Sequence, residues 1–448
     1  MARPVIEFVH DLALDDLPTA VVGRMRACLM DLLGVAAAGH RTRLSAVARG
    51  HAVQYMQGAE RTARLLFDGR AVSPLGAAFA NAATIDAMDG HDGHRLTKGH
   101  AGVAVLPAAL SLVTENPATA LGDLLTALVV GYEIAYRAGA VLHRSTSDYH
   151  SSGSWNAIGA AAVAARLLAL NPAETAHALG IAEYQAPRAP MMRCIDHPSM
   201  VKDSSAWGAE AGVSGALLAA GGFTGAPSAL VTDRADDWDD LGDRWMVLEQ
   251  YFKPYPVCRW SHPAIHATIG LVRRYDVAPR EIQDIRVTTF HAATRLGTRS
   301  PADTEQAQYS LPFTVACAAV HRQLEVDDVV HPERMGAEVR RLAMTLQVHE
   351  SAEMTSAFPA SRGAEVTLIL TDGRRLESGP TQAPGDPEAA LSPAELEHKF
   401  LAWAGGGIGR PRAHRVLSLI QGEPSLSELL AEIYPPVDAA EAPSQRPC

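Results

Sequence analysis

The stretch WNAIGAAAVAARLLAL, residues 155–170, consists mainly of alanine and leucine, and its apolar residues recur three and four positions apart. This period is typical of a helix, and alanine has a high intrinsic helix propensity. Small alanine side chains also let neighbouring helices approach closely. Similar text runs from about residue 17 to residue 248, for example LGDLLTALVVGYEIAYRAGAVL at 121–142. The sequence therefore predicts that this part of the chain forms a large, all-helical bundle.

The pattern changes in the second half of the chain. Residues 282–290 and 364–378 alternate apolar with polar side chains and favour β-branched types, which is typical of strands. The pair Asp372–Gly373 lies where a hairpin turn between two strands would be. With helices expected between these strands, near 310–320 and 332–342, this region predicts a small α+β unit.

Helical text returns after a proline-containing loop, in AELEHKFLAWAG and PSLSELLAEIY. We therefore predict a mainly α fold with two domains. The large helical domain comprises residues 1–260 and is completed by residues 392–448, and the smaller α+β domain comprises residues 261–391. Two domains fit a length of 448 residues, because single hydrophobic cores stop growing at roughly 250 to 300 residues.

The composition argues against several classes of partner. The chain has 39 basic and 50 acidic residues and a formal charge of -11, so no positive face for nucleic acid is expected. No apolar run reaches the roughly 18 residues of a membrane span, and the first residues do not form a signal peptide. The cysteines are odd in number and far apart, which favours a reducing compartment. We expect a cytoplasmic protein that binds neither nucleic acid nor a membrane.

The stretch IDAMDGHDGHRLTKGHAG, residues 85–102, concentrates titratable groups between two apolar, helix-like segments. The preceding helix is predicted to end at Asp89–Gly90, because glycine adopts the left-handed conformation of a helix end. The glycines of this stretch also let a ligand approach the backbone closely. Its acidic and imidazole side chains are Asp86, Asp89, His91, Asp92, His94 and His100.

Three interpretations of this stretch compete. A solvated polar loop is one, although such loops seldom lie between such apolar helices. A metal site is the second, with His91 and His94 plus Asp89 or Asp92 as ligands, but an HxxH spacing without a second group of ligands is a weak signal. Acid–base catalysis without a metal is the third, and we favour it. The absence of GxGxxG, GxxxxGK(S/T), GxSxG and HExxH argues against nucleotide cofactors and serine-hydrolase chemistry.

Polar residues also interrupt apolar text elsewhere. His150 and Ser151 precede a helix whose free N-terminal amides favour a bound carboxylate, and Lys202 precedes another alanine-rich helix. Cations suit a substrate with several carboxylates, and histidines suit proton transfer at neutral pH. A proline-stiffened junction, YFKPYPVCRWSHPAIHA, adds Lys253, Arg259 and His262.

Six blocks in a fixed order span most of the chain: LMDLLGVAAAG (29–39), DGHDG to GHAGVAVLPAAL (89–110), YHSSGSWNAIGAAAVAARLLAL (149–170), MVKDSSAWGAEAGVSGALLAAGGFTG (200–225), KPYPVCRWSHPAIHA (253–267) and YSLPFTVACAAV (309–320). In these blocks the chain resembles the MmgE/PrpD family, which contains 2-methylcitrate dehydratase, cis-aconitate decarboxylase and iminodisuccinate epimerase. The resemblance implies a helical domain built from both chain ends, a smaller α+β domain and a homodimer. It also implies an active site between the domains, with no metal and no organic cofactor.

The resemblance carries the family's site residues onto positions of this chain: the first-loop acids onto Asp89 and Asp92, and the other motif residues onto His100, His150, Lys202, Lys253 and His262. The chain also departs from the family. Dehydratases and decarboxylases typically read DxDDT in the first loop, where this chain reads DGHDG, so His91 replaces an acid and Gly93 removes a hydroxyl. Phe313 stands where the family often has tyrosine. We therefore expect a substrate other than 2-methylcitrate.

The family's activities begin by weakening a bond at a carbon next to a carboxylate, so the site must stabilise an enolate-like dianion. The cations Lys202, Lys253 and Arg259 are expected to supply this stabilisation. We expect His100 or His150 to act as base and His91 or His262 as acid. Asp89 and Asp92 would orient these rings, and the further substrate contacts are assigned to Asp92 and Ser151.

The predicted function is a cofactor-independent dehydratase of a small hydroxy-polycarboxylate. Return of the proton to the opposite face would make the enzyme an epimerase, and loss of carbon dioxide would make it a decarboxylase. The sequence alone does not separate these reactions. A non-catalytic binding protein on the same fold and a metal-dependent hydrolase are the more distant alternatives.

Overall fold

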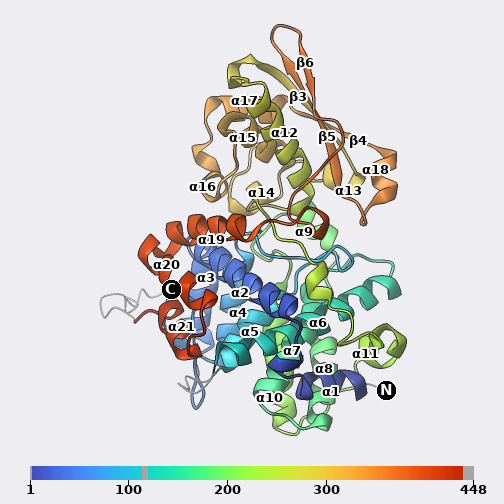
Figure 1. Cartoon of the computed structure of the whole chain (residues 1–448), viewed down its shortest axis with the longest axis vertical. Helices are drawn as coiled ribbons and strands as arrows, with labels where there is room; N and C mark the ends of the chain where they lie inside the picture. The colour runs from blue at the N-terminus through green and yellow to red at the C-terminus, as the bar shows by residue number, and fades with distance from the viewer. Residues whose placement is uncertain (1–2, 114–119, 437–448) are drawn as a thin grey trace.

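The computed structural model describes residues 3–113 and 120–436, which form a large helical body and a smaller α+β body (Figure 1). The large body contains α1 (Arg3–Asp11), α2 (Thr19–Gly39), α3 (Arg43–Tyr55), α4 (Pro74–Asp86), α5 (Gly102–Leu112), α6 (Leu121–Ser145), α7 (Gly153–Leu167), α8 (Pro172–Gln185), α9 (Met191–Asp196), α10 (Ser205–Ala220) and α11 (Ala229–Thr232). A two-stranded pair, β1 (Ala63–Arg64) and β2 (Ala71–Val72), lies beside α3 and α4.

The alanine-rich helix α7 lies at the centre of the large body, against α5, α6, α8 and α10. The close approach of these helices depends on glycines, which have no side chain. A Cβ atom at Gly159 would lie 2.4 Å from the carbonyl oxygen of Gly131 on α6. A Cβ atom at Gly212 of α10 would lie 2.5 Å from the Cβ atom of Ala160. The structure therefore confirms the predicted all-helical bundle with closely packed helices.

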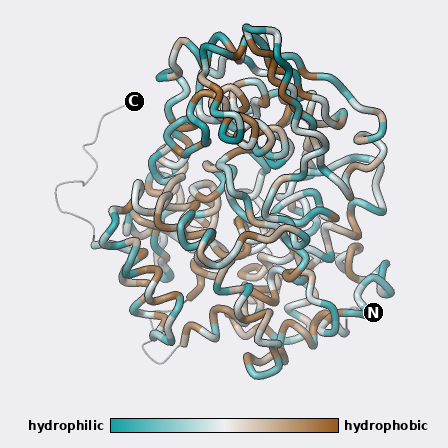
Figure 2. The backbone as a smooth tube through the Cα atoms, turned by 45° about the horizontal axis from the view of Figure 1, so that its top comes forward, coloured by the Kyte–Doolittle hydropathy of each residue, from teal (hydrophilic) through white to brown (hydrophobic). Residues whose placement is uncertain are grey.

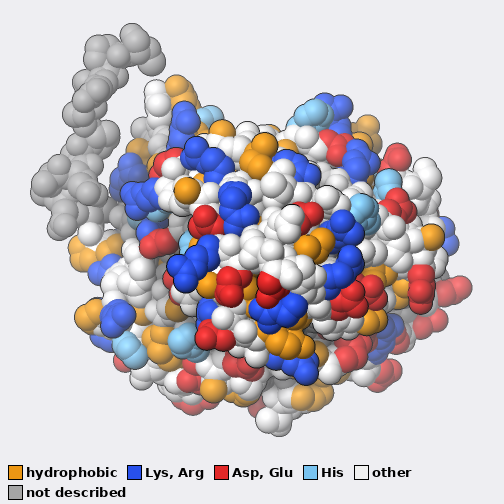
Figure 3. Space-filling model, turned by 90° about the horizontal axis from the view of Figure 1, so that it is seen from above, with side chains coloured by type: hydrophobic (Ala, Val, Ile, Leu, Met, Phe, Trp, Pro, Cys, Tyr) orange, Lys and Arg blue, Asp and Glu red, His pale blue; other side chains and the backbone are white. Residues whose placement is uncertain are grey.

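Helix α6 is long and apolar enough to cross a membrane by length and composition, yet its apolar window is 100% buried inside the protein. This is typical of a core helix. Figure 2 shows hydrophobic and hydrophilic stretches alternating along the peripheral helices, as expected when each buries one face. Viewed from the α+β end, the surface mixes Lys and Arg with Asp and Glu (Figure 3), without a continuous positive patch on this face.

The small body contains the helices α12 (His262–Arg274), α13 (His291–Thr294), α14 (Thr304–Gln308), α15 (Leu311–His321), α16 (Val326–Val330), α17 (Ala337–Thr345) and α18 (Ala352–Ala357). Its strands are β3 (Ile282–Thr289), β4 (Gln347–Glu350), β5 (Gly363–Leu370), β6 (Arg375–Glu377) and β7 (Thr381–Gln382). The sheet order is β4-β3-β5-β6, with β7 also paired to β5.

The predicted strand 282–290 corresponds to β3, which pairs antiparallel with β5 from Ile282–Leu370 to Thr289–Ala364. The predicted hairpin is the β5–β6 pair, and Gly373 takes a left-handed φ of 87° in its turn. Strand β4 was not predicted from the sequence, because it is a short edge strand that pairs parallel to β3 and buries no side chain fully. Helices α12, α15 and α17 pack together beside β3 and β5.

The C-terminal helices α19 (Pro393–Ile408), α20 (Arg410–Gln421) and α21 (Leu426–Ile433) return to the large body. Helix α19 packs along α2, so segments from both ends of the chain lie side by side, as the blue and red helices of Figure 1 show. The mainly α fold with a smaller α+β part is therefore confirmed. The boundaries at 260 and 392 stay a prediction, and residues 437–448 of the helical part lie outside the described residues.

Candidate active site

A small polar cavity of about 30 Å³ lies where the two bodies meet. This volume holds a few water molecules at most, so a larger ligand could enter only if the walls of the cavity moved apart. The large body, the junction after residue 250 and the small body all contribute to its wall. The lining side chains used below are Asp86, Asp89, Lys98, His100, Tyr149, Asp203, Tyr251, Lys253, Cys258, Arg259, Tyr309 and Arg362.

The first-loop residues reach the cavity because α4 ends early. The helix ends at Asp86 rather than at the predicted Asp89–Gly90. Gln308 of the small body takes over the backbone groups of the next turn, since its amide nitrogen donates to the Ala87 carbonyl at 3.0 Å and its oxygen accepts from the Asp89 N–H at 2.6 Å. Gly90 does not take a left-handed conformation. It serves close packing instead, because a Cβ atom there would lie 2.2 Å from the Trp403 ring.

Asp89 lies between two buried lysines. The Lys253 ammonium donates to its carboxylate, and the side chains are only 1% and 6% exposed. Lys202 donates to the Gln308 oxygen at 2.7 Å and lies 4.7 Å from the centre of the Tyr309 ring. Burial alone would raise the pKa of Asp89, but Lys253, and after it Lys202, lowers that pKa well below its ordinary value. Asp89 is therefore an ionised partner of the lysines.

His100 presents a free nitrogen to the cavity. Its Nδ1 lies 2.5 Å from the Asp92 carbonyl, and because a carbonyl only accepts, Nδ1 carries the proton. Among the described residues, Nε2 has no hydrogen-bond partner. Burial, and then His91 and Lys253, lowers the pKa of His100 well below its ordinary value. The ring is therefore neutral near pH 7, with a lone pair available on Nε2.

Three residues contact His100 and fix its position. Its backbone N–H donates to the Ser152 hydroxyl at 2.9 Å, and its carbonyl accepts from the Asn156 side chain at 3.1 Å. The His91 ring meets the His100 ring edge-on, with centroids 4.3 Å apart, and its Nε2 lies 3.4 Å from an Asp86 oxygen. His91 thus lies beside the predicted base.

Asp89, His91 and His100 could also offer a metal one ligand atom each, within 4.8 Å of one another. Electrostatics opposes this arrangement, because the carboxylate is already paired with the Lys253 ammonium and Lys202 lies nearby. The absence of a metal from the mechanism stays a prediction.

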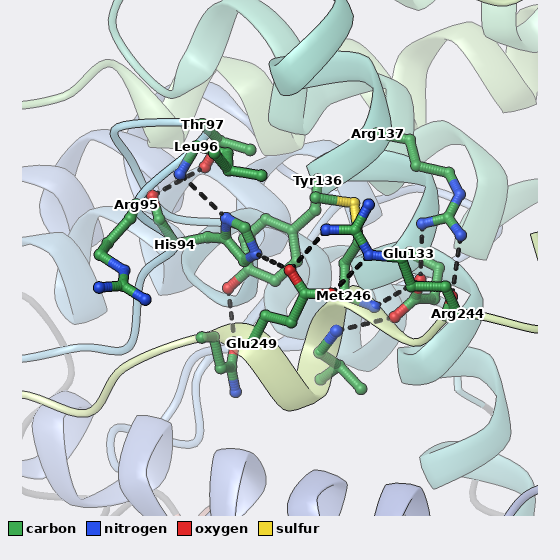
Figure 4. A network of polar contacts seen from close by, with 12 residues as sticks. His94, Arg95, Leu96, Thr97, Glu133, Tyr136, Arg137, Arg244, Met246 and Glu249 are labelled. Carbon is green, nitrogen blue, oxygen red and sulfur yellow. Dashed lines mark hydrogen bonds and ion pairs between the residues drawn. The ribbon is translucent and has the colours of Figure 1, made fainter. Parts of the chain in front are cut away.

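His94, the other ligand of the metal alternative, points into a separate polar network (Figure 4). Its Nδ1 accepts from the Leu96 N–H at 3.2 Å, and its Nε2 lies 3.8 Å from Glu249, which is paired with Arg244. Burial lowers the pKa of His94 to about 4. His94 is therefore a neutral structural residue away from the cavity lining.

The N-terminus of α7 is already occupied, contrary to the expected substrate contact there. Asp203 accepts from the backbone N–H of Ser152 at 3.0 Å and from its hydroxyl. Burial, and then the Asp86 carboxylate, raises the pKa of Asp203 to about 7, so this cavity-lining carboxyl can carry a proton at neutral pH. The neighbouring Ser151 is buried, and the cavity lining does not include it.

The cavity lining does not include three of the predicted catalytic histidines, His91, His150 and His262, nor the predicted catalytic Lys202. His150 is partly exposed, and its Nδ1 donates to the Asp148 carbonyl at 3.0 Å. His262 is fully buried; its Nε2 lies 3.0 Å from the Val257 carbonyl and its Nδ1 lies 3.4 Å from Arg259. The histidine of the junction thus contacts an arginine of the lining, while Cys258 from the same block lies in the lining itself.

Asp92 is fully buried and accepts a hydrogen bond of 2.6 Å from the Tyr132 hydroxyl. Its carbonyl orients His100, but its carboxylate is outside the lining, so the expected substrate contact has no support from the geometry. Phe313 is likewise buried in the hydrophobic core and outside the lining. At Gly93, a Cβ atom would lie 2.6 Å from the Tyr251 hydroxyl. The place left by the missing threonine is therefore filled by a tyrosine that lines the cavity.

Two cations of the cavity lining have no acidic partner among the described residues: Lys98 and Arg362. Lys202 is outside this lining, although it lies against Tyr309, which belongs to it. The other two cations of the lining are neutralised, Lys253 by Asp89 and Arg259 by Asp386 at 2.7 Å. Lys98 and Lys202 also adopt left-handed φ values of 52° and 51°, which non-glycine residues rarely adopt and which cluster at functional sites.

Sequence reasoning missed several of these residues. Lys98 and Asp203 are contained in stretches already selected for their polar residues, so their position was visible in the sequence. Tyr251 likewise begins the selected block YFKPYPVCRWSHPAIHA. Gln308 and Arg362 had no such signal, because only the docking of distant segments brings them to the site.

A larger hollow of about 690 Å³ lies among α3, α4 and α10. Its lining is mainly apolar, including Phe79, Val201 and Trp207, but it also contains Lys202, and it shares Asp86 with the polar cavity. Because apolar surface does not compensate buried carboxylates, the smaller, charged cavity is the candidate site for acid–base chemistry on a polycarboxylate. The predicted homodimer and the cytoplasmic location stay predictions.

Comparison with known proteins gives matches over most of the chain. The MmgE/PrpD N-terminal domain matches residues 4–239, and the MmgE/PrpD C-terminal domain matches residues 255–421. A cis-aconitate decarboxylase of Aspergillus terreus is 25% identical over 99% of this chain and 96% of its own length. A cis-aconitate decarboxylase-like protein, oryM, of Aspergillus oryzae is 25% identical over 95% of each chain. Because the two domain matches together cover most of the residues, the chain belongs to the MmgE/PrpD family.

Proposed function

We propose that this protein is a cofactor-independent lyase that removes a proton from a carbon next to a carboxylate of a small polycarboxylate. Dehydration of a hydroxy-polycarboxylate is the first candidate reaction. One observation carries the proposal: a neutral imidazole with a free Nε2, His100, lines a cavity together with two cations that lack acidic partners among the described residues, Lys98 and Arg362.

The cations define the class of substrate. Buried or half-buried cations without partners are costly, and carboxylates would offset that cost. Lys202 lies next to the Asp89–Lys253 pair, and Lys98 and Arg362 line the same cavity, so a ligand with two or more carboxylates can neutralise the site. The positive charge would also stabilise the enolate-like dianion formed when the proton leaves.

The geometry supports removal of a proton as the first step. His100 Nε2 takes the proton from the carbon, and the C–H electron pair moves toward the adjacent carboxylate to give the enolate-like dianion. This electron pair then forms the new C=C bond as the C–O bond to the hydroxyl group breaks. The departing hydroxide accepts a proton and leaves as water. Asp203, with its pKa raised to about 7 by burial and by Asp86, supplies that proton. Asp89 stays ionised and holds Lys253 in place.

Decarboxylation is the second candidate, because the curated relatives are named cis-aconitate decarboxylases. Its first step would break a C–C bond, release carbon dioxide and place a proton on the remaining carbon. A neutral His100 is better suited to accept a proton than to donate one, so the geometry favours dehydration.

The proposal is tested by incubating the purified protein with a panel of hydroxy- and unsaturated di- and tricarboxylates in deuterated buffer. We expect one hydroxy-polycarboxylate to lose water, with new ultraviolet absorbance from a conjugated alkene and incorporation of deuterium in the reverse direction. Release of carbon dioxide would identify the second candidate, and deuterium incorporation without an absorbance change would indicate an epimerase. Stabilisation by ligands with no turnover of any compound would show a binding protein and refute the proposal.

Treatment with a chelator is expected to leave turnover unchanged. Asp89, the carboxylate that a metal would need, is neutralised by Lys253. The measurement is the turnover rate after dialysis against EDTA, with elemental analysis of the same sample. Loss of activity that returns with added zinc or magnesium would instead support the metal-dependent alternative.

A further inference from the structure

We propose that Lys98 and Arg362 form a clamp for a second carboxylate of the substrate, on the Tyr149 side of the cavity. This inference rests on the proposed function for the identity of the ligand, and it adds the residues that distinguish polycarboxylates from smaller acids. Neither residue was assigned a role from the sequence or by the family resemblance.

Arg362 is an incompletely bonded buried cation. It is 5% exposed, and its Nε is buried without a hydrogen-bond partner in the described part of the chain. Its Nη2 donates a 3.4 Å hydrogen bond to the Arg95 carbonyl, and the guanidinium lies 5.5 Å from the centre of the Tyr251 ring. Buried guanidinium N–H groups normally find acceptors, so an acceptor is missing at this place.

Lys98 faces the same missing acceptor. Its ammonium lies 5.1 Å from the centre of the Tyr149 ring, and the Tyr149 hydroxyl donates to its backbone carbonyl. This bond helps to hold the left-handed backbone that directs the side chain to the cavity. Burial, and then the neighbouring Arg362, lowers the pKa of Lys98. The two cations thus repel each other, and an anion between them would turn the repulsion into attraction.

The chemistry of the pair favours a carboxylate. A guanidinium fork offers two parallel N–H donors to the two oxygens of a carboxylate, and a lysine adds a point charge. Arg362 precedes β5 of the small body, whereas Lys98 lies in the loop between α4 and α5 of the large body. A carboxylate held by both would therefore link the two bodies across the cavity.

The test is calorimetric binding of tricarballylate, a tricarboxylate without a hydroxyl group to eliminate. R362Q is expected to weaken binding about 10- to 100-fold, because a hydrogen-bonded charge contact is lost. K98M should weaken it by a similar factor, and the double variant by less than the product of the two. R340Q, which removes an exposed arginine of α17 in the same body, serves as the matched control and should bind like the parent protein.

Turnover gives a second measurement. With a substrate from the panel, R362Q should raise KM strongly and change kcat little, since the clamp holds a carboxylate away from the reacting carbon. R362K, which keeps the positive charge without the guanidinium fork, should have a KM between those of the parent protein and R362Q. Thermal unfolding checks that each variant is folded.

Unchanged tricarballylate binding in folded R362Q and K98M would overturn the clamp, and so would an equal loss in R340Q. If the parent protein binds tricarballylate through Arg362 but transforms no member of the panel, the clamp stands and the proposed reaction fails. If a panel compound is transformed and R362Q retains its KM, the reaction stands and the clamp fails.

Discussion

Replacing His100 by glutamine is expected to lower kcat by about 10²- to 10⁴-fold, the usual contribution of a positioned general base. Glutamine can still donate to the Asp92 carbonyl, as His100 Nδ1 does, but it offers no basic nitrogen at the position of Nε2. The structural cost should therefore be small. The measurement is kcat from steady-state kinetics together with the rate of deuterium exchange into substrate, both of which should fall together.

The pH dependence supplies a further check on His100. Burial, and then His91 and Lys253, lowers its pKa well below the ordinary value, so the base becomes protonated only at pH values below the usual range of histidine. The activity of the parent enzyme should therefore not fall through loss of this base between pH 7 and pH 6.

H94Q is the matched control for H100Q, because His94 is a buried neutral histidine outside the lining and its replacement should leave deuterium exchange intact. Full exchange in H100Q would remove His100 from the mechanism.

The helical domain and the hairpin could be predicted because their signals are local. Alanine seams specify close helix packing, and the pair Asp372–Gly373 specifies a turn through the left-handed glycine. The end of α4 could not be predicted in the same way. The backbone groups that follow Asp86, the Ala87 carbonyl and the Asp89 N–H, bond to Gln308, more than two hundred residues later, so the helix stops for a reason outside its own sequence.

In the candidate site, too, the residues with a local sequence signal were predicted and the others were not. Asp89, His100 and Lys253 were found because they occupy polar interruptions in apolar text, and they lie together. The N-terminus of α7 looked like an anion site from sequence, yet the chain supplies its own carboxyl group there, that of Asp203. The direction of a side chain also limits prediction from sequence, because the spacing of a motif does not show which of its histidines points toward a cavity.

Replacing Lys253 by methionine is expected to destabilise the protein by about 3 to 5 kcal/mol, the usual cost of leaving one member of a buried ion pair alone. Asp89, 6% exposed in its side chain, would lose the ammonium that contacts it. Lys202, which also lowers the pKa of Asp89, remains nearby, so the loss should lie toward the lower end of this range. Activity should fall as well, since the ammonium lines the cavity. Urea unfolding monitored by circular dichroism measures the change in stability.

The destabilisation of K253M should depend on pH in a defined direction. In the parent protein, Lys253 keeps the pKa of Asp89 below its unfolded value, so the pair contributes stability above that value and loses it as pH falls through the folded pKa. In K253M, burial would instead raise the pKa of Asp89, and protonation would relieve the unpaired charge. The difference between variant and parent should therefore shrink as pH is lowered from about 7 toward the ordinary aspartate pKa of about 4.

The double variant D89N/K253M separates the charge from the volume of the lysine. With both charges removed, the buried carboxylate no longer lacks a partner, and most of the lost stability should return while activity stays low. Equal destabilisation of K253M and the double variant, independent of pH, would mean that Lys253 acts by packing alone. In that case the Asp89–Lys253 pair would not be the fixed ionic element on which we base the arrangement of the site.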